Sequence, residues 1–426
     1  MSQAARILLS LVAGLLLGIA TAHWAGGFAE RAAAFAEPIG GLWLDALRMT
    51  IVPLIVALLV IGIADSAEAA RASRVAARAM AMFLVILFFS AVLASILIPL
   101  WFSLWPMPAE SAAALKGALS ASPEKVGDVP GFGVFLRSMV PTNPIAAAAN
   151  DAILPLIVFT TVFAFALTRL PDEPRLLLTR FFRAISDTML VIINWVLWLA
   201  PLGVFALAYV VGARAGASAF GALLHYIFLV SSVGLTILIL AYPVGVIGGR
   251  VSLPAFARAV APSQAVAIST QSSLASLPAM LRGAHALGVP VAASGVILPL
   301  AVAVFRATGS GMNLAVALYV AHWFGVHLGP AQIAVGLAAG TLTTIGSVSL
   351  PGQISFVTSI APICLAIGVP IEPLVLLVAV ETIPDIFRTV GNVTMDVAVT
   401  ATVARRSGFD ASEEGQEDRL LEGSAA

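Results

Sequence analysis

Residues 269–278 read STQSSLASLP and residues 343–352 read TTIGSVSLPG, and both lie in the middle of long apolar stretches. Each contains the tripeptide Ser-Leu-Pro, at 276–278 and at 349–351, and each is followed by a long apolar segment. Unwound backbone with free polar groups is tolerated at membrane depth where it lines a cavity. A kinked spanning helix would explain either stretch alone. Two matching stretches favour a pair of helix–break–helix hairpins, the inverted repeat of a secondary transporter.

The composition of the chain excludes a water-soluble domain. Hydrophobic residues occupy 60% of the 426 positions and charged residues 10%, and the mean hydropathy is +1.03, whereas a soluble domain carries about 25% charge. Most of the surface is therefore expected to face lipid. The net charge is zero, which argues against a nucleic-acid partner. The single cysteine, Cys364, forms no intrachain disulfide and, by itself, no metal site.

Apolar segments long enough to cross a bilayer predict eight spanning helices. They lie near residues 7–25, 42–64, 80–105, 145–168, 185–212, 220–248, 290–324 and 372–404. The two interrupted stretches, 255–284 and 331–369, are expected to re-enter the membrane without crossing it. The predicted fold is therefore an all-α integral membrane protein with eight transmembrane helices plus two re-entrant helical hairpins.

Arginine placement predicts the orientation, because cytoplasmic loops collect Lys and Arg. Four sets of arginines follow the second, fourth, sixth and eighth spans: Arg71, Arg74 and Arg78; Arg169, Arg175, Arg180 and Arg183; Arg250 and Arg258; Arg405 and Arg406. All four sets fall on one side of the membrane if the N terminus is cytoplasmic. We expect a multi-pass protein of a bacterial cytoplasmic (inner) membrane, with both termini in the cytoplasm.

The last predicted span carries an unusual number of polar residues. Glu381, Asp385, Arg388, Asn392 and Asp396 are spaced by four, three, four and four, which places them on one helix face. Each unpaired charge near the bilayer centre costs about 2.5–3.5 kcal/mol. The face is therefore expected to bind a ligand or a cation, with a self-paired structural network as the alternative. Arginine grips carboxylates, and a nearby aspartate suits an ammonium group, so the pattern indicates a zwitterionic acidic substrate.

A charged residue also lies in another predicted span. Arg306 is in the middle of the seventh span, among glycines that indicate a locally unwound segment. A buried arginine keeps its proton and needs an anion beside it. The sequence contains no phosphate loop, nucleophile elbow or metal-ligand cluster, so we do not expect an enzyme.

The motifs together resemble the dicarboxylate/amino-acid:cation symporters, the family of the archaeal aspartate and animal glutamate transporters. The resemblance extends over nearly the whole chain, to about Arg406. It rests on Pro141-Thr-Asn-Pro144, Leu154-Pro155, Ala200-Pro-Leu-Gly-Val-Phe205, Ser272-Ser273 through Leu277-Pro278, Ile345-Gly346 through Pro351-Gly352, and Asp385-x-x-Arg388-Thr389-x-x-Asn392-x-x-x-Asp396.

This resemblance implies a glutamate-transporter-like elevator fold with inverted repeats, assembled as a homotrimer. The implied division has scaffold helices 1–2 in residues 1–79, a third helix of the transport domain in 80–105, an extracytoplasmic loop in 106–140, scaffold helices 4–5 in 141–212, a transport domain in 213–406 and a disordered acidic tail in 407–426. The second hairpin would act as the gate.

The resemblance also implies the substrate site. Arg388 would bind the side-chain carboxylate of the substrate and Asp385 its amino group, and the presence of Asp385 favours aspartate or glutamate over a plain dicarboxylate. The other substrate-binding residues would be Thr389, Asn392, Ser272, Ser273, Ser349, Pro351 and Gly352.

The sequence departs from the family pattern where sodium should bind. Phe305-Arg306-Ala307-Thr308-Gly309 stands where the family has Asn-Met-Asp-Gly-Thr, and Ile86-x-x-Phe89-Ser90 stands where it has Tyr-x-x-Thr-Ser. The side chains of Phe, Ala and Ile offer no oxygen to a cation. We therefore hypothesise that Arg306 replaces a bound cation beside Asp396 or Asp385.

Transport would then be sodium-independent, exchange-only, or proton-coupled through Glu381 or Asp385. A residual sodium site remains open as an expectation, at Thr344, Ile345, Ser347 and Ala303. No cofactor is expected, apart from Na⁺ or H⁺ as a coupling ion. The sequence thus predicts a secondary active transporter, symporter or exchanger, of an acidic amino acid. A transporter of C4-dicarboxylates or other small carboxylates is the first alternative, and an uncoupled anion channel or substrate sensor is the second.

Overall fold

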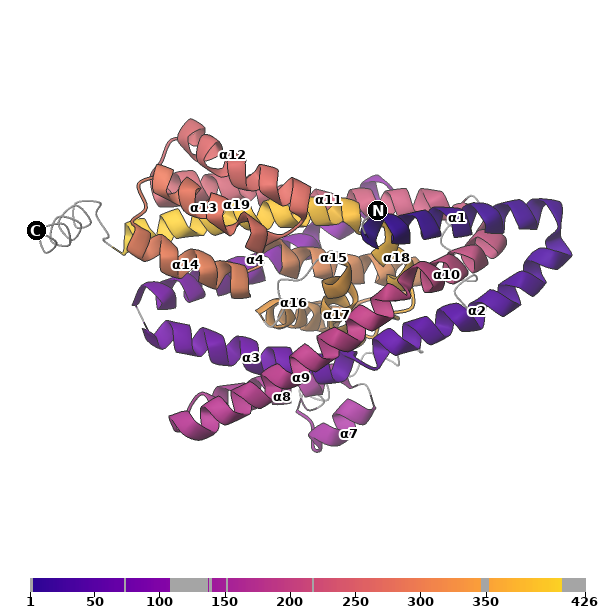
Figure 1. Ribbon diagram of the computed structural model, residues 1–426, viewed down its shortest axis with the longest axis horizontal. Coiled ribbons are helices and arrows are strands. Elements are labelled where there is room, and N and C mark those ends of the chain that lie inside the picture. The colour runs from indigo at the N-terminus through magenta and orange to yellow at the C-terminus, as the bar shows by residue number, and fades with distance from the viewer. Residues whose placement is uncertain are drawn as a thin grey trace, which may run out of the picture.

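The computed structural model describes residues 3–72, 74–107, 137, 140–150, 152–216, 218–345 and 352–407, and the regular secondary structure of these ranges is helical (Figure 1). The elements are α1 (Gln3–Trp24), α2 (Gly26–Arg48), α3 (Ile51–Ala72), α4 (Arg74–Leu104), α7 (Pro144–Ala149), α8 (Ile153–Leu167), α9 (Asp172–Trp198), α10 (Ala200–Ala215), α11 (Ser218–Pro243), η1 (Val244–Gly248), α12 (Leu253–Thr270), α13 (Ser273–Ala286), α14 (Val291–Val304), α15 (Ala307–Phe324), α16 (Pro330–Ile345), α17 (Gly352–Ala366), α18 (Leu374–Val380) and α19 (Thr382–Arg406).

Five segments of the described chain are long and apolar enough to cross a membrane, and a bent helix pair makes a sixth. The five are Arg6–Trp24, Gly27–Glu68, Arg74–Leu104, Gly221–Gly248 and Val291–Phe324. The all-helical, multi-pass prediction is confirmed, whereas the count of eight spans stays a prediction. The predicted span 145–168 is divided between α7 and α8, and α8 has 15 residues, which is short for a crossing helix.

Two predicted spans are divided where a proline removes a backbone donor. The span predicted at 185–212 consists of α9 and α10, which meet at an angle of 56° and have Pro201 in the first turn of α10. The span predicted at 372–404 consists of α18 and α19, which are separated at Glu381. Pro384 has no N–H to donate to the carbonyl of Val380, so the helix is interrupted there.

The centre of the molecule is built around α15 and α19. Nearly every side chain of α15 is buried, because α4, α11, α16, α17 and α19 pack around it. In the same way α19 is buried over most of its length, against α11, η1, α12, α13, α14 and α15. A helix enclosed on all sides must turn any polar face toward other protein groups. This packing places the polar face of α19 in the interior.

The first interrupted stretch forms the predicted helix–break–helix. α12 and α13 pack against each other, and Gln271, which ends α12, has a left-handed backbone with φ of 52°. Ser272 begins α13 as its N-cap, where the Ser272 Oγ accepts a hydrogen bond of 3.2 Å from the Ala275 N–H. α16 and α17 form the corresponding packed pair, and the break predicted between them, 346–351, lies outside the described residues.

A contrasting region of tight helix packing joins α1 to α10. Gly14 and Gly18 of α1 form a G-x-x-x-G pair, and Gly212 of α10 lies against the backbone of Leu15. A Cβ atom on Gly18 would overlap the backbone of Tyr209. Small residues let two helix backbones approach closely in an apolar environment, so these glycines fix the α1–α10 contact.

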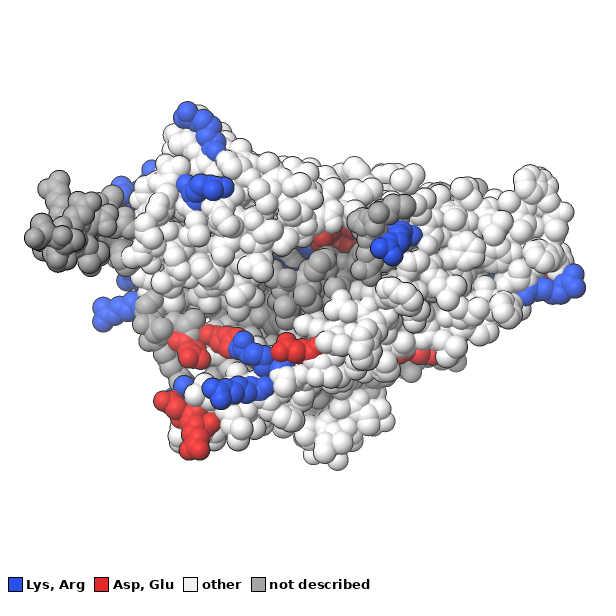
Figure 2. Space-filling view, viewed as in Figure 1, with Lys and Arg blue, Asp and Glu red and all other residues white. Residues whose placement is uncertain are grey.

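The ends of α3, α8 and α19 and the beginning of α12 lie toward the same end of the molecule, on the left in Figure 1. Each of these ends is next to one of the four predicted arginine sets. Most Lys and Arg side chains visible in Figure 2 gather at that end, and much of the remaining surface carries no charge. The loop that contains both lysines and the acidic tail after Ser407 lie outside the described residues, apart from Arg137 and a few flanking positions of the loop.

Candidate functional site

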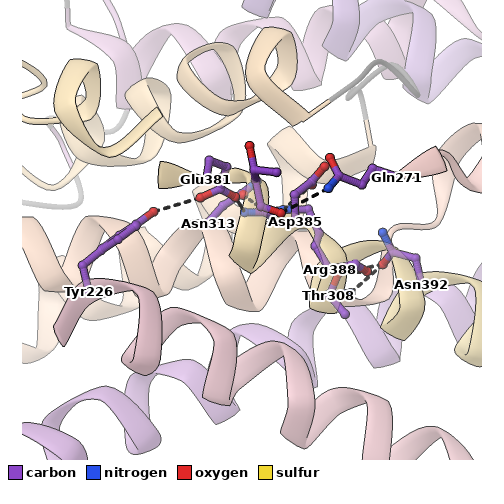
Figure 3. Close-up of polar contacts among 9 residues, drawn as sticks. Tyr226, Gln271, Thr308, Asn313, Glu381, Asp385, Arg388 and Asn392 are labelled. Carbon is purple, nitrogen blue, oxygen red and sulfur yellow. Dashed lines mark hydrogen bonds and ion pairs between the residues drawn. The ribbon is translucent and has the colours of Figure 1, made fainter. Parts of the chain in front are cut away.

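Glu381, Asp385, Arg388 and Asn392 lie along one side of α19, as their spacing predicted (Figure 3). Glu381, at the N-cap position, is 1% exposed, and Asp385 and Asn392 are also buried. The side chain of Arg388 is 12% exposed, and Asp396 is completely buried. An unpaired charge in such surroundings is costly, so the partners of each group decide what the site does.

The guanidinium group of Arg388 is held through all three of its nitrogen atoms. Its Nη2 contacts Glu381 Oε1 at 2.5 Å, its Nη1 donates to Asn313 Oδ1 at 2.7 Å, and its Nε lies 3.3 Å from Asp385 Oδ1. Two carboxylates and an amide oxygen thus surround one cation, which is the arrangement that a planar guanidinium favours. Arg388 and Asp385 were predicted together, whereas Asn313 was not predicted.

A second helix fixes the other oxygen of Glu381. The hydroxyl of Tyr226, on α11, donates to Glu381 Oε2 at 3.0 Å, and the side chain of Tyr226 is completely buried. Both carboxylate oxygens of Glu381 are therefore engaged, one by a cation and one by a neutral donor. Tyr226 was also missed by the sequence analysis. The sequence shows Tyr226 as a single phenol in a long apolar segment, and nothing in that segment indicates a contact with Glu381.

Asn392 is bonded to the start of α15. The backbone N–H and the hydroxyl of Thr308 both donate to Asn392 Oδ1, at 2.9 and 2.8 Å, and the same hydroxyl lies 2.9 Å from the carbonyl oxygen of Arg388. Thr308 occupies one of the positions where the sodium motif is altered. The amide oxygen that would serve as a cation ligand is thus occupied by protein donors. Thr389, the neighbour of Arg388, is buried on the same helix.

Asp396 differs from the other polar residues of α19 in its surroundings. Neither of its carboxylate oxygens has a hydrogen-bond partner among the described residues. The charged group that acts on it is Arg306, which lies at the break between α14 and α15. Arg306 interacts electrostatically with Asp385 as well as with Asp396. The structure therefore places the guanidinium of Arg306 within electrostatic range of both carboxylates.

The tip of the first hairpin reaches the beginning of α19. The side-chain nitrogen of Gln271 donates to the carbonyl oxygen of Thr382 at 3.2 Å. Ser272 and Ser273, which were predicted to bind substrate, follow directly in the chain and are partly buried. The hydroxyl of Ser272 is used for helix capping in this structure. The hairpin tip is thus close to Glu381 and Asp385.

The predicted residues of the second hairpin are described only in part. Ser347, Ser349 and Pro351 lie outside the described residues, and Gly352 is the first residue of α17. Of the residues proposed for a residual sodium site, Thr344 and Ile345 are buried at the end of α16, and Ala303 is exposed on α14.

The end of α16 does come close to the start of α15. A Cβ atom built on Gly309 would lie 3.1 Å from Thr344 Cγ2 and 3.2 Å from Arg306 Cβ. The hydroxyl of Thr344 donates to the Gly340 carbonyl oxygen of its own helix. In the described ranges, no group of three or more His, Cys, Asp or Glu side chains is arranged to hold a metal ion.

Comparisons with known proteins find transporters that match most of this chain. The proton/glutamate-aspartate symporter of Escherichia coli (strain K12) is 28% identical over 95% of this chain and 92% of its own length. The neutral amino acid transporter B(0) of Homo sapiens is 29% identical over 91% and 77%, and the C4-dicarboxylate transport protein of Laribacter hongkongensis (strain HLHK9) is 23% identical over 94% and 88%. The sequence profile of the sodium:dicarboxylate symporter family matches residues 4–406. The chain is therefore a membrane transporter and not an enzyme, and it belongs to the sodium:dicarboxylate symporter family.

Proposed function

We propose that this protein is a secondary active transporter of an acidic amino acid such as aspartate or glutamate. The observation that carries the proposal is the partly buried Arg388 with Asp385 beside it, at the place where the first hairpin tip meets α19. A guanidinium suits the substrate side-chain carboxylate, and a carboxylate suits the ammonium group. Thr389, Asn392, Ser272, Ser273, Ser349, Pro351 and Gly352 would complete the site.

The elevator mechanism and the homotrimer form part of the same proposal. The division into scaffold helices and a transport domain in 213–406, together with helix 3, is supported by the packing of α4 against α14, α15, α16 and α19. The second hairpin, α16–α17, would close over the substrate. The common end shared by the four arginine sets supports cytoplasmic termini in a bacterial inner membrane.

The second part of the proposal is that sodium coupling is reduced or absent because Arg306 supplies a permanent positive charge. Its electrostatic interaction with Asp385 and Asp396 supports this role. The bonds from Thr308 to Asn392 Oδ1 also support it, because they occupy an oxygen that a sodium ion would need. A residual sodium site at the end of α16 would survive only through main-chain oxygens.

A C4-dicarboxylate is the second candidate substrate, because relatives of that name match most of the chain. A dicarboxylate has no ammonium group for Asp385 to bind, and a second carboxylate in that place would be repelled. Competition by succinate and malate, measured against aspartate, therefore distinguishes the two candidates.

The deciding experiment is uptake of labelled L-aspartate into proteoliposomes preloaded with unlabelled aspartate, in sodium and in choline buffers. Equal exchange in both buffers is the expected result. Exchange in sodium alone would contradict the role given to Arg306. Failure to exchange aspartate, glutamate, succinate or malate in either buffer would contradict the proposed substrate class.

A further inference from the structure

Glu381 occupies Arg388 in the way that a substrate carboxylate is proposed to do. Its Oε1 lies on Arg388 Nη2, and its Oε2 accepts the Tyr226 hydroxyl, in surroundings that leave Glu381 1% exposed. With Asn313 on Nη1 and Asp385 on Nε, the guanidinium has no unoccupied nitrogen in this structure. A guanidinium carries five N–H groups, and the shortest of these contacts is the one from Nη2 to Glu381, so a carboxylate that pairs with that edge of Arg388 competes with Glu381.

Glu381 is the group best placed to be displaced. Asp385 lies farther from Arg388 than Glu381 does, and it retains a second cation, Arg306, if Arg388 turns toward the substrate. Asp396 lies about two helical turns from Arg388 along α19, and Arg306 is the charged group that acts on it. Glu381 faces Arg388 as its near cation and Tyr226 as a neutral donor. Once Arg388 is lost to the substrate, Glu381 would be a buried carboxylate without a cation.

A buried carboxylate that loses its cation takes up a proton rather than remain charged. The groups that face Glu381 from the surrounding elements are Arg388 and Asp385 on α19, with Tyr226 on α11. The proton comes from solvent and adds to the Glu381 carboxylate as its ion pair with Arg388 breaks and the substrate pair forms. Tyr226 continues to donate to the remaining carbonyl oxygen.

We propose that Glu381 is the proton-binding residue of this transporter. Substrate and proton bind together because the substrate carboxylate displaces Glu381 from Arg388, and the displaced Glu381 takes up the proton. The inference rests on the proposed function and names its coupling ion. It assigns the proton to this carboxylate and keeps for Asp385 the proposed role of binding the ammonium group of the substrate. Because a proton is taken up on binding, the affinity for substrate is expected to fall as the pH rises.

Isothermal titration calorimetry of aspartate binding to the purified protein tests this directly, in two buffers of different ionisation enthalpy. Wild-type protein should take up about one proton per substrate near neutral pH, and its affinity should fall by up to about tenfold per pH unit. Glu381→Gln should bind without proton uptake and with little pH dependence. Glu372→Gln, the same change nine residues earlier in the chain, should behave as wild type.

Glu381→Asp keeps a carboxylate at this position and is the second test. It should retain proton uptake with a weaker hold on Arg388, which separates the proton role from a purely structural one. Proton uptake that persists in Glu381→Gln would overturn the inference, as would wild-type binding without any uptake. If wild-type protein binds no acidic amino acid or dicarboxylate, the proposed function itself fails, and the role of Glu381 fails with it.

Discussion

The two ends of the polar face of α19 hold their charges in opposite ways. At the first end, Arg388 is bonded through each nitrogen, at 2.5 to 3.3 Å, to Glu381, Asn313 and Asp385. At the second end, Asp396 is completely buried, and its oxygens have no hydrogen-bond partner in the described part of the chain. The charged group that acts on it is Arg306, which lies on another element.

The two ends of the polar face therefore depend on different kinds of interaction. Short, directional bonds depend on the shape of both partners, so the Arg388 end is sensitive to which carboxylate sits there. A charge balanced without hydrogen bonds depends on the sign and distance of its neighbour and much less on its shape. The first end is therefore suited to exchanging one carboxylate for another. At the second end, the charged group that acts on Asp396 is a side chain from another element.

The largest effect is expected from Arg388→Lys, which keeps the charge and removes the planar fork. A lysine ammonium has three donors on one atom and cannot reproduce the planar, bidentate edge of the guanidinium, so aspartate affinity should fall about 100-fold, or about 3 kcal/mol. Calorimetric affinity and exchange in proteoliposomes both measure it. Arg405→Lys, at the exposed end of the same helix, is the matched control. Unchanged affinity in Arg388→Lys would show that charge alone suffices at this end.

The second end is tested by removing its charges one at a time. Arg306→Met leaves Asp396 buried without a cation, so the free energy of unfolding should fall by about 3 kcal/mol. Asp396→Asn removes the charge that needs balancing, and the double variant should recover most of the loss. Thermal unfolding in detergent, completed as a double-mutant cycle, gives the coupling between the two sites. Additive effects of the two substitutions would mean that Arg306 does not balance Asp396.

The features within one helix were largely predictable from the sequence, and those between helices were not. Spacing of three and four fixed the polar face of α19, because helix periodicity depends on no other element. The break at Gln271–Ser272 was also predictable, because the run of hydroxyl side chains around it is visible in the local sequence. Tyr226 and Asn313 come from α11 and α15, and their polar atoms meet α19 only through tertiary packing.

Thr308 illustrates a different limit. The sequence indicated a departure from the family pattern at Phe305–Gly309, but it did not indicate what the residues present there would contact. The structure places the Thr308 hydroxyl against Asn392 Oδ1, which depends on how the break before α15 faces α19. Helix ends set by a missing proline donor, such as the one at Glu381, were also not resolved by hydropathy, because the flanking segments are equally apolar.

The smallest effect is expected from Thr308→Val. This variant tests to which end of the polar face of α19 Asn392 belongs. Valine keeps the shape and removes the hydroxyl, while the backbone N–H of residue 308 still donates to Asn392 Oδ1. The loss should be about 1 kcal/mol in unfolding free energy, since one neutral hydrogen bond goes and its acceptor stays partly satisfied. Thr341→Val, which removes a hydroxyl that donates to the Leu337 carbonyl oxygen of its own helix, is the control.

The same variant also sharpens the sodium argument. Removing the hydroxyl leaves one lone pair of Asn392 Oδ1 open to a cation, but Arg306 still supplies the positive charge beside Asp396. Exchange by Thr308→Val should therefore remain equal in sodium and choline. Sodium stimulation of this variant, with Arg306 intact, would place the barrier to sodium at the hydroxyl rather than at the arginine. Asn392 would then belong with Asp396, in the part of the face that balances charge.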